Sequence, residues 1–317
     1  MGSVVGSAAP PRTRTSRTRR ERFRRHMMQN QLAYLLILPS TILIALIYFY
    51  PLGSGFWQSL HNFNRVKPWA YRFIGLGNYA TALKTHEFWV ALRTSIIWVV
   101  GGVVLSYLLG LVCALLLNEK FRLRGIYRAL LLLPWVVPPV VSGTSWLWMF
   151  ADQDGLVNRT LSSLHLIREP IYWLSQPTLA MVAVIIVHVW QSFPFMMITV
   201  LSALSGIPDD IYEAGRIDGA SGVQLFRYIT FPLILPVSVI ATVLSSIWTF
   251  NDFGTIWVMT GGGPANATTT LIIQSYKEAF QRFNVGYGTS LAVIAMILML
   301  CIGAVYLRLQ ARQQEMW

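Results

Sequence analysis

The chain has 317 residues, of which 55% are hydrophobic and only 12% are charged. A soluble domain carries about twice that charged fraction, so the composition excludes an ordinary soluble protein and indicates a chain solvated largely by lipid. The net charge of +12 does not indicate nucleic-acid binding, because eight arginines are concentrated between Arg12 and Arg25. We interpret residues 1–31 as a basic cytoplasmic tail that fixes the topology of the chain.

A helix needs about 20 apolar residues to cross a bilayer. Six apolar stretches approach or exceed this length, and none contains a lysine or an arginine. They are Leu32–Tyr50, Thr94–Leu117, Ala129–Phe150, Leu179–Leu204, Leu233–Met259 and Tyr287–Leu307. We therefore predict an all-α integral membrane protein with about six transmembrane helices, whose membrane domain covers residues 32–310.

The basic residues between these stretches predict the orientation of the chain. With the N-terminus inside, the cytoplasmic segments hold the arginine tail, Lys120, Arg122, Arg124, Arg128, Arg216, Arg227, Arg308 and Arg312. We expect a multi-pass protein of a bacterial or archaeal cytoplasmic (inner) membrane, with both termini cytoplasmic, including the C-terminal end at residues 311–317.

The cytoplasmic segment at residues 205–232 has the pattern of a helix-turn-helix rather than a plain connection. Proline at position 208 followed by Asp209 and Asp210 is typical of a helix start. Gly219 suits a left-handed turn residue, and Ser221 suits the N-cap of a second short helix that runs to Thr230 and stops before the next proline. Between them, Ala214 and Gly215 leave a bare patch that another backbone could approach.

This segment resembles the "EAA" loop of binding-protein-dependent ATP-binding-cassette (ABC) importer permeases, whose pattern is Glu-Ala-Ala, three residues, Gly, nine residues, Ile-x-Leu-Pro. The matching positions are Glu213, Ala214, Gly215, Gly219, Ile229 and Pro232. The chain departs from the pattern with Gly215 for the third small residue and with Phe231 for leucine, which keeps the size or apolar character. The alternative is an ordinary amphipathic connection.

The resemblance is greatest to carbohydrate-type permeases of the maltose and glycerol-phosphate kind, through Phe250-Asn251-Asp252-Phe253 and Thr260-Gly261-Gly262-Gly263-Pro264. It implies a second permease subunit, two ATPase subunits and an extracytoplasmic solute-binding protein as partners, with the loop docked in a cleft of the ATPase. ATP and magnesium would then bind the partner ATPase. This chain itself is expected to be no enzyme and to carry no cofactor, metal site or catalytic residue.

Polar side chains recur at helical spacing in the fourth and fifth spans and predict a hydrated path for the solute. The predicted path residues are Gln191, Ser192, Thr242, Ser245, Thr249, Asn251 and Asp252. For the hydroxyl residues alone, helix packing is the preferred alternative, as we expect for Gly102, Ser106 and Gly110. The amide and the acid favour a path, because such groups at membrane depth usually mark one.

Aromatic residues at Trp190, Phe193, Trp248 and Phe250 alternate with these polar groups, a mixture that suits a sugar. No cationic residue falls within the spans, which argues against a phosphorylated solute. We expect a mono- or oligosaccharide to be imported by alternating access, with glycerol phosphate or another polyol as the alternative.

Two other classes of protein compete with an importer. A membrane transferase acting on lipid-linked sugar would use Asp152-Gln153-Asp154 to hold a metal ion, although acids in such loops are ordinary turn formers. A channel would not need the Glu213 loop. The glycines at 261–263 lack the lysine of a phosphate-binding loop and predict a flexible external loop that could contact a binding protein.

Overall fold

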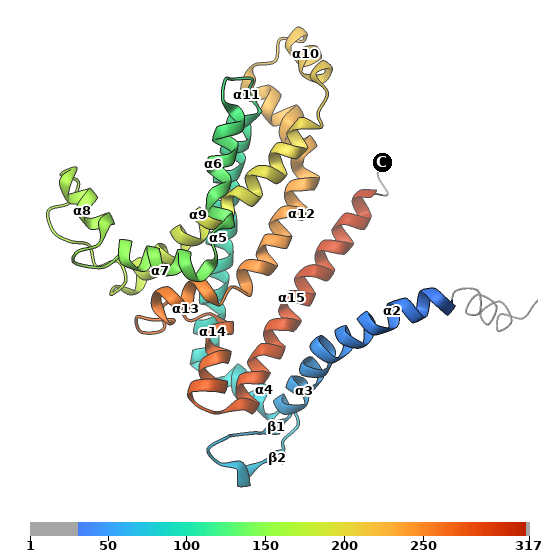
Figure 1. Ribbon diagram of the computed structural model, residues 1–317, viewed down its shortest axis with the longest axis vertical. Helices are drawn as coiled ribbons and strands as arrows, with labels where there is room; N and C mark the ends of the chain where they lie inside the picture. Colours follow the sequence, from blue (N-terminus) through green and yellow to red (C-terminus); the bar gives the residue numbers. More distant parts are fainter. Residues whose placement is uncertain (1–30, 315–317) are drawn as a thin grey trace, which may run out of the picture. The chain divides into compact units, whose positions relative to one another are not determined.

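The computed structural model describes residues 31–314, so the predicted arginine tail and residues 315–317 lie outside the described residues. The chain divides into two compact units, residues 1–54 and 55–317, which are treated separately. The α-helices are α2 (Gln31–Ile44), α3 (Tyr50–Ser59), α4 (Gly77–Lys84), α5 (His86–Asn118), α6 (Arg124–Val136), α7 (Pro139–Met149), α8 (Leu156–Ser163), α9 (Pro177–Ser205), α10 (Asp209–Ile217), α11 (Gly222–Leu225), α12 (Phe231–Phe250), α13 (Gly254–Thr260), α14 (Leu271–Tyr276) and α15 (Val285–Gln314) (Figure 1). Wider π-helical turns occur at Ala45–Phe49, Phe226–Thr230 and Lys277–Gln281, a 3-10 turn at Pro68–Ala70, and the two strands are β1 (His61–Asn62) and β2 (Arg72–Phe73).

The described part of the first unit, residues 31–54, is helical. The candidate span that begins here runs from Ala33 to Ser59, longer at its C-terminal end than the predicted stretch. Every described side chain from Ala33 to Gly53 is exposed within the chain. An apolar helix of this kind is unfavourable in water, which fits a membrane-spanning segment.

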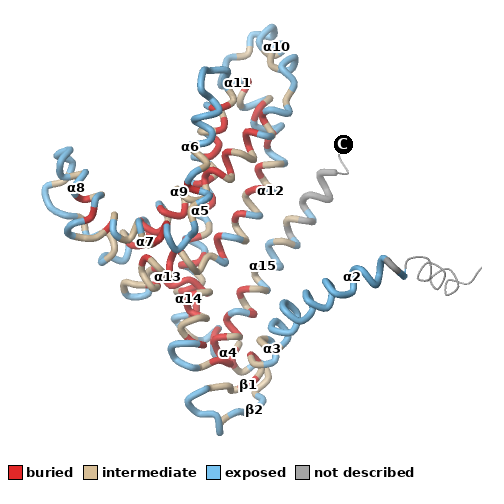
Figure 2. The backbone as a smooth tube through the Cα atoms, viewed as in Figure 1, coloured by how far each residue is buried: buried red, intermediate tan, exposed pale blue. Residues whose placement is uncertain are grey.

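The core of the second unit is formed by α5, α9 and α12, which pack along one another (Figures 1 and 2). Glycine allows the closest approach between α5 and α9. A Cβ atom at Gly110 would lie 2.6 Å from Met196 Cβ and 2.8 Å from the backbone nitrogen of Met197. Ser106 and Gly102 are buried on the same face. The predicted packing role of these three small residues is confirmed.

The predicted third span is broken into two helices. α6 and α7 meet at an angle of 93° across the two residues Val137 and Pro138. The break follows from the proline pair, since neither ring nitrogen can donate a helical hydrogen bond. Among the described residues, five helices are long and apolar enough to cross a membrane, or six if the bent pair counts as one span.

The predicted fifth span, Leu233–Met259, is wrong at both ends. The helix begins at Gly222 and ends at Phe250, and α13 is separate. The second short helix does not stop before Pro232, because the wide turn at Phe226–Thr230 carries it onward: the N–H of Phe231 donates to the carbonyl of Phe226, five residues earlier. α11, the wide turn and α12 therefore form one continuous helix.

The connections predicted to be cytoplasmic share one end of this unit. The connection after α5 reaches the start of α10, where Lys120 Nζ lies 3.7 Å from Asp209 Oδ2. The hairpin of β1 and β2, together with α4, lies at the opposite end (Figure 1). This arrangement is the one expected if the basic connections lie on one side of the membrane.

Candidate functional site

The helix-turn-helix at α10 and α11 is built from local signals that the sequence carries. Asp209 and Asp210 occupy the first turn of α10, where the helix dipole favours acids. Gly219 has φ of +80°, a conformation that costs other residues free energy. Ser221 caps α11 in a capping box with Gln224, whose side chain accepts the Ser221 N–H at 2.7 Å. The predicted left-handed glycine and the predicted N-cap are confirmed.

Gly215 faces the interior of this motif. A Cβ atom there would lie 2.7 Å from Leu225 Cδ2 and 2.9 Å from Ile229 Cδ1. Nearby, the Tyr212 hydroxyl is 3.1 Å from the Thr230 hydroxyl. The expectation that Gly215 forms a bare patch for another backbone is wrong, because α10 packs this glycine against α11 and the π-turn.

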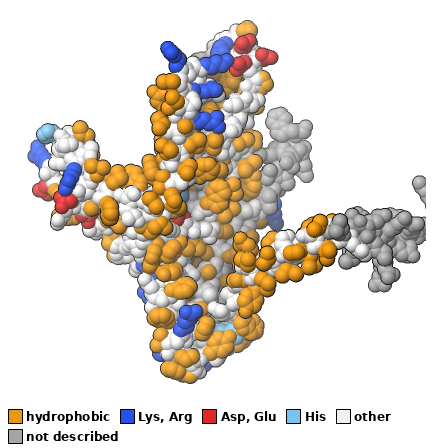
Figure 3. Space-filling view, in the orientation of Figure 1, with side chains coloured by type: hydrophobic (Ala, Val, Ile, Leu, Met, Phe, Trp, Pro, Cys, Tyr) orange, Lys and Arg blue, Asp and Glu red, His pale blue; other side chains and the backbone are white. Residues whose placement is uncertain are grey.

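The outward face of α10 is both charged and apolar. Glu213 and Ala214 are exposed, as is Pro232 at the start of α12. Ile217 of α10 and Val223 of the adjoining α11 are 86% and 77% exposed. Acidic and basic side chains gather at this end of the molecule (Figure 3). Sequence reasoning missed these two apolar residues, although their position beside the motif was a usable signal.

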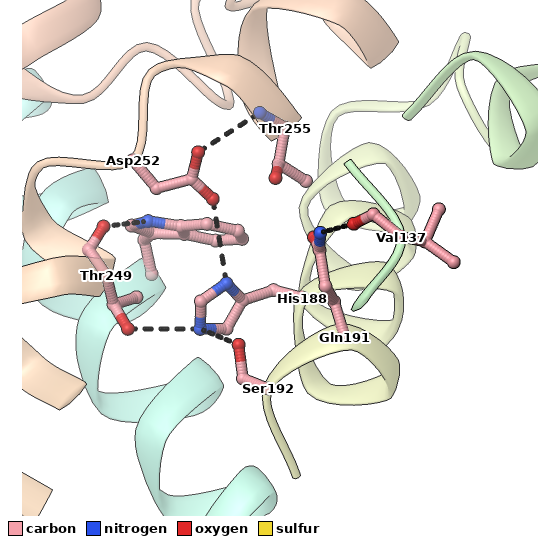
Figure 4. A network of polar contacts seen from close by, with 8 residues as sticks. Val137, His188, Gln191, Ser192, Thr249, Asp252 and Thr255 are labelled. Carbon is pink, nitrogen blue, oxygen red and sulfur yellow. Dashed lines mark hydrogen bonds and ion pairs between the residues drawn. The ribbon is translucent and has the colours of Figure 1, made fainter. Parts of the chain in front are cut away.

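A polar network joins three helices within the core (Figure 4). His188 on α9 is buried, with its Nδ1 atom 3.6 Å from Asp252 Oδ2. Its Nε2 atom lies 3.0 Å from Thr249 Oγ1 and 3.3 Å from Ser192 Oγ. The Trp98 indole on α5 donates to the Thr249 carbonyl at 2.8 Å. The imidazole therefore ties α9 to the end of α12, which α5 also holds.

Asp252 has two structural partners in this network. Besides facing His188, its Oδ1 atom accepts the N–H of Thr255 at 3.1 Å, which stabilises the first turn of α13. Its side chain is 20% exposed. A carboxylate that is paired and hydrogen-bonded in this way avoids the large cost of burying an isolated charge. The network thus fixes the geometry of the break between α12 and α13.

The predicted path residues separate into three groups. Ser245 and Thr249 are buried against helices of the same chain, which is the packing arrangement considered as the alternative. Thr242 is half-buried and its hydroxyl donates to the Ser238 carbonyl at 2.9 Å. Gln191 and Ser192 are half-buried, and Asn251 is exposed.

Gln191 compensates for the break in the third span. Its Nε2 atom donates to the carbonyl of Val137 at 3.0 Å, at the point where the proline pair interrupts the helix (Figure 4). The freed carbonyl at membrane depth needs such a donor. In the structure, this amide therefore holds α6 and α7 against α9.

The aromatic residues also divide by burial. Phe193 and Phe250 are each 6% exposed and belong to the core, so they cannot reach a solute in this conformation. Trp248 is 52% exposed and forms an edge-to-face contact with Phe195, whose ring lies near Trp135. We call Trp135, Phe195 and Trp248 the aromatic ladder. Sequence reasoning missed Trp135, which meets the other two rings only through the packing of α6, α9 and α12.

The two remaining loop motifs serve to hold loops together. Asp152 accepts the N–H of Leu174 at 3.0 Å and the hydroxyl of Ser175, whereas Asp154 pairs with Arg159 at 3.3 Å. Both acids thus have protein partners, and no group of three metal-ligating side chains occurs among the residues that the structure describes.

Threonines brace the glycine-rich loop. The hydroxyl of Thr269 donates to the Gly262 carbonyl at 2.7 Å, and that of Thr268 donates to the Gly263 carbonyl at 2.8 Å. Gly262 is buried. The following threonines therefore satisfy the backbone carbonyls of this loop, and the expectation that it is flexible stays a prediction.

Comparison with known proteins places these features in a family. Residues 106–315 match the model of the family described as "Binding-protein-dependent transport system inner membrane component". The chain is 38% identical over 281 residues to the trehalose/maltose transport system permease protein MalF of Thermococcus litoralis, covering 88% of this chain and 93% of that protein. It is 30% identical to the trehalose transport system permease protein SugA of Mycobacterium tuberculosis, covering 89% and 90%.

A solved structure has the same fold. A chain from the crystal structure of a bacterial ABC transporter involved in the import of the acidic polysaccharide alginate matches with a TM-score of 0.79, at 20% identity, over 92% of this chain and 99% of that one. The matched family model covers α9, the α10–α11 motif and the residues of the His188 network other than Trp98. The chain belongs to the family of binding-protein-dependent transport system inner membrane components and is a permease subunit rather than an enzyme.

Proposed function

We propose that the chain is the permease subunit of an ATP-driven importer that moves a mono- or oligosaccharide into the cell by alternating access. The observation that carries the proposal is the exposed α10 face around Glu213, which projects from the end of the core where basic connections gather. Relatives of 38% and 30% identity are trehalose/maltose and trehalose permeases, which supports a carbohydrate as the solute.

The α10 face suits docking to a second protein. Its exposed Ile217 and Val223 would cost free energy in water, and burial against a partner removes that cost. Exposed Glu213 beside them can form a charge-assisted contact. We propose the ATPase subunit as this partner, with ATP and magnesium bound there, and with a second permease subunit and an extracytoplasmic solute-binding protein completing the complex.

Movement of α10 can reach the core along one continuous helix. α9 is a continuous helix from Pro177 to Ser205, and α10 begins four residues after it ends. His188 on this helix holds the end of α12 through Thr249. A displacement of the docked α10 can therefore reach the polar network through α9.

The aromatic ladder offers a surface for a sugar. Trp135 and Trp248 are 49% and 52% exposed, and Asn251 follows at the exposed end of α12. Rings can stack on the C–H faces of a sugar, while an amide can bond its hydroxyls. We therefore propose that the path follows this exposed face, with Asn251 and the half-buried Gln191, Ser192 and Thr242 as its polar residues. The second permease subunit would form the opposite wall.

Uptake and thiol labelling test the proposal. Vesicles that carry the chain with its copurifying subunits and a binding protein should accumulate radiolabelled trehalose or maltose on ATP addition, but not glycerol phosphate. A cysteine at Gly222 should be protected from an impermeant thiol reagent outside intact cells, whereas cysteines at Ser163 and Ala265 should react. Labelling at Gly222 from outside would overturn the orientation, and uptake of only the phosphate ester would overturn the carbohydrate assignment.

A further inference from the structure

A short hairpin is fastened to the end of the last span. We call residues 61–73, which include β1 and β2, the aromatic hairpin. The N–H of Gly286 in α15 donates to the Phe63 carbonyl at 2.9 Å, and the N–H of Arg65 donates to the Phe283 carbonyl at 2.9 Å. Gly286 is needed for this contact, since a Cβ there would lie 2.2 Å from the His61 carbonyl oxygen.

This attachment fixes the height of the hairpin relative to a bilayer. One candidate span ends at Ser59, two residues before β1, and another begins at Val285, beside the attached backbone. Asn78 ties the base further by donating to the Ser59 and His61 carbonyls at 2.7 and 2.9 Å. Strands rise about 3.3 Å per residue, so a hairpin of this length cannot extend far from the membrane surface.

The free side of the hairpin combines exposed apolar side chains with cations. Val66, Trp69 and Phe73 are 60%, 80% and 64% exposed. Arg65, Lys67 and Arg72 are exposed among them, and no acidic residue occurs between positions 60 and 86. Hydrophobic and basic side chains lie together at this end of the molecule in Figure 3.

The base of the hairpin is held by ring contacts, in which the exposed Phe73 also takes part. His61 is buried, stacks on Tyr71 with ring centroids 4.8 Å apart, and meets Phe73 edge to face at 5.3 Å. The His61 ring also contacts the Trp57 carbonyl through Nδ1 at 2.8 Å. The exposed residues are therefore presented on a preformed support and need little ordering on binding.

We infer that the aromatic hairpin is an anchor in the membrane interface, with Val66 and Trp69 among the headgroups and with Arg65, Lys67 and Arg72 on the phosphates of anionic lipids. Tryptophan is favoured at this depth, and cations near an anionic leaflet are attracted to it. The proposed topology places the anchor in the outer leaflet. A reversed topology would move the anchor to the inner leaflet without removing it.

A spin label at Val66 tests the anchor, because this position leaves Trp69 and the cations in place. The full chain, with Cys113 and Cys301 replaced by serine and Val66 by cysteine, is reconstituted in nanodiscs that contain phosphatidylglycerol. The label should collide more often with oxygen than with an aqueous nickel chelate, whereas a label at exposed Ser163 on α8 should show the reverse. Val66 accessible to the chelate would overturn the anchor, and so would shielding from both reagents, which would indicate a protein partner.

The charge requirement is tested in the same discs. When Arg65, Lys67 and Arg72 are replaced with glutamine, the label at Val66 should collide more often with the aqueous nickel chelate. The hairpin with its three cations intact should show the same increase in discs of phosphatidylcholine. Arg168→Gln, in another loop, should leave the label unchanged. An unchanged Val66 signal in both treatments would overturn the role of anionic lipid. None of these readouts uses transport, so they remain interpretable if the proposed solute is wrong.

Discussion

The α10–α11 turn and the polar network around His188 are built in different ways. The turn is assembled from residues close together in sequence, such as Gly219 with φ of +80° and Ser221 capped by its neighbour Gln224, and much of its surface is exposed. The network joins Trp98 to Thr249 across 151 positions of the chain, and its histidine is buried.

Because the turn is exposed and the network is buried, the two regions should contribute to transport in different ways. An exposed turn contributes little to the stability of the chain itself, so its surface is available for another subunit. A buried network holds helices together, so its loss affects folding and movement at once. Substitutions in the two regions should therefore differ in whether a loss of uptake is accompanied by a loss of stability.

The largest effect is expected at Gly219. Gly219→Val places a β-branched residue in a left-handed conformation that costs roughly 1–2 kcal/mol, and the exposed turn relieves this strain locally by changing its own shape. Uptake and the stimulation of ATPase activity by loaded binding protein should fall nearly to background, while membrane insertion and melting temperature stay close to the parent. Glu213→Ala should give the same pattern, through loss of the docking contact.

Gly222→Val is the matched control for Gly219. A Cβ atom at either glycine would have no neighbour within 4 Å, and of the two only Gly219 has positive φ. The Gly222 variant should transport normally. Equal uptake by the two variants would show that the left-handed turn is not required for coupling.

A smaller effect, divided between stability and uptake, is expected at Asp252. Asp252→Leu leaves His188 and the Thr255 N–H without their acceptor, at a cost of roughly 1–3 kcal/mol. Thermal unfolding of the purified complex should shift to lower temperature and uptake should fall with it. Asp252→Asn keeps an oxygen for Thr255 and should retain partial transport. Full stability with lost uptake in the leucine variant would instead indicate direct contact with the solute.

The aromatic ladder should respond in substrate affinity alone. Trp248→Ala removes an exposed stacking surface, so the KM for sugar uptake should rise by about tenfold, equivalent to ~1.4 kcal/mol, with an unchanged melting temperature. Leu244→Ala, one turn away and 40% exposed, is the control and should leave KM unchanged. If KM rises for Ser245→Val and not for Trp248→Ala, the solute path follows the buried face of α12 instead of the aromatic ladder.

The smallest effect is expected at Gly215. In Gly215→Ala the new methyl group meets only the ends of the Leu225 and Ile229 side chains, which can rotate away. ATPase stimulation should change by less than about twofold, since movement of these two flexible side-chain ends relieves the contact without displacing the backbone. Gly215→Leu should separate α10 from α11 and reduce stimulation much further. An alanine variant as impaired as the leucine variant would mean that a partner backbone approaches this glycine.

Local and periodic signals carried most of what could be predicted. The apolar stretches located the spans, and the proline, glycine and serine of the loop located its turn. The C-terminal limit of the fifth helix was missed because an apolar segment, α13, follows Asn251 and Asp252, whereas the helix itself ends at Phe250. Facing helices also decide burial: the stripe through Ser245 and Thr249 has helical spacing whether α5 and α9 or a solute lies opposite it.

Photocrosslinking from Ile217 tests the central claim most directly, because this residue is 86% exposed on the α10 face assigned to docking. A photoreactive amino acid at Ile217 in the assembled transporter should give an adduct with the ATPase subunit, and the same amino acid at Val66 should give none. An adduct of Ile217 with the extracytoplasmic binding protein, or no protein adduct in an actively transporting complex, would contradict the account.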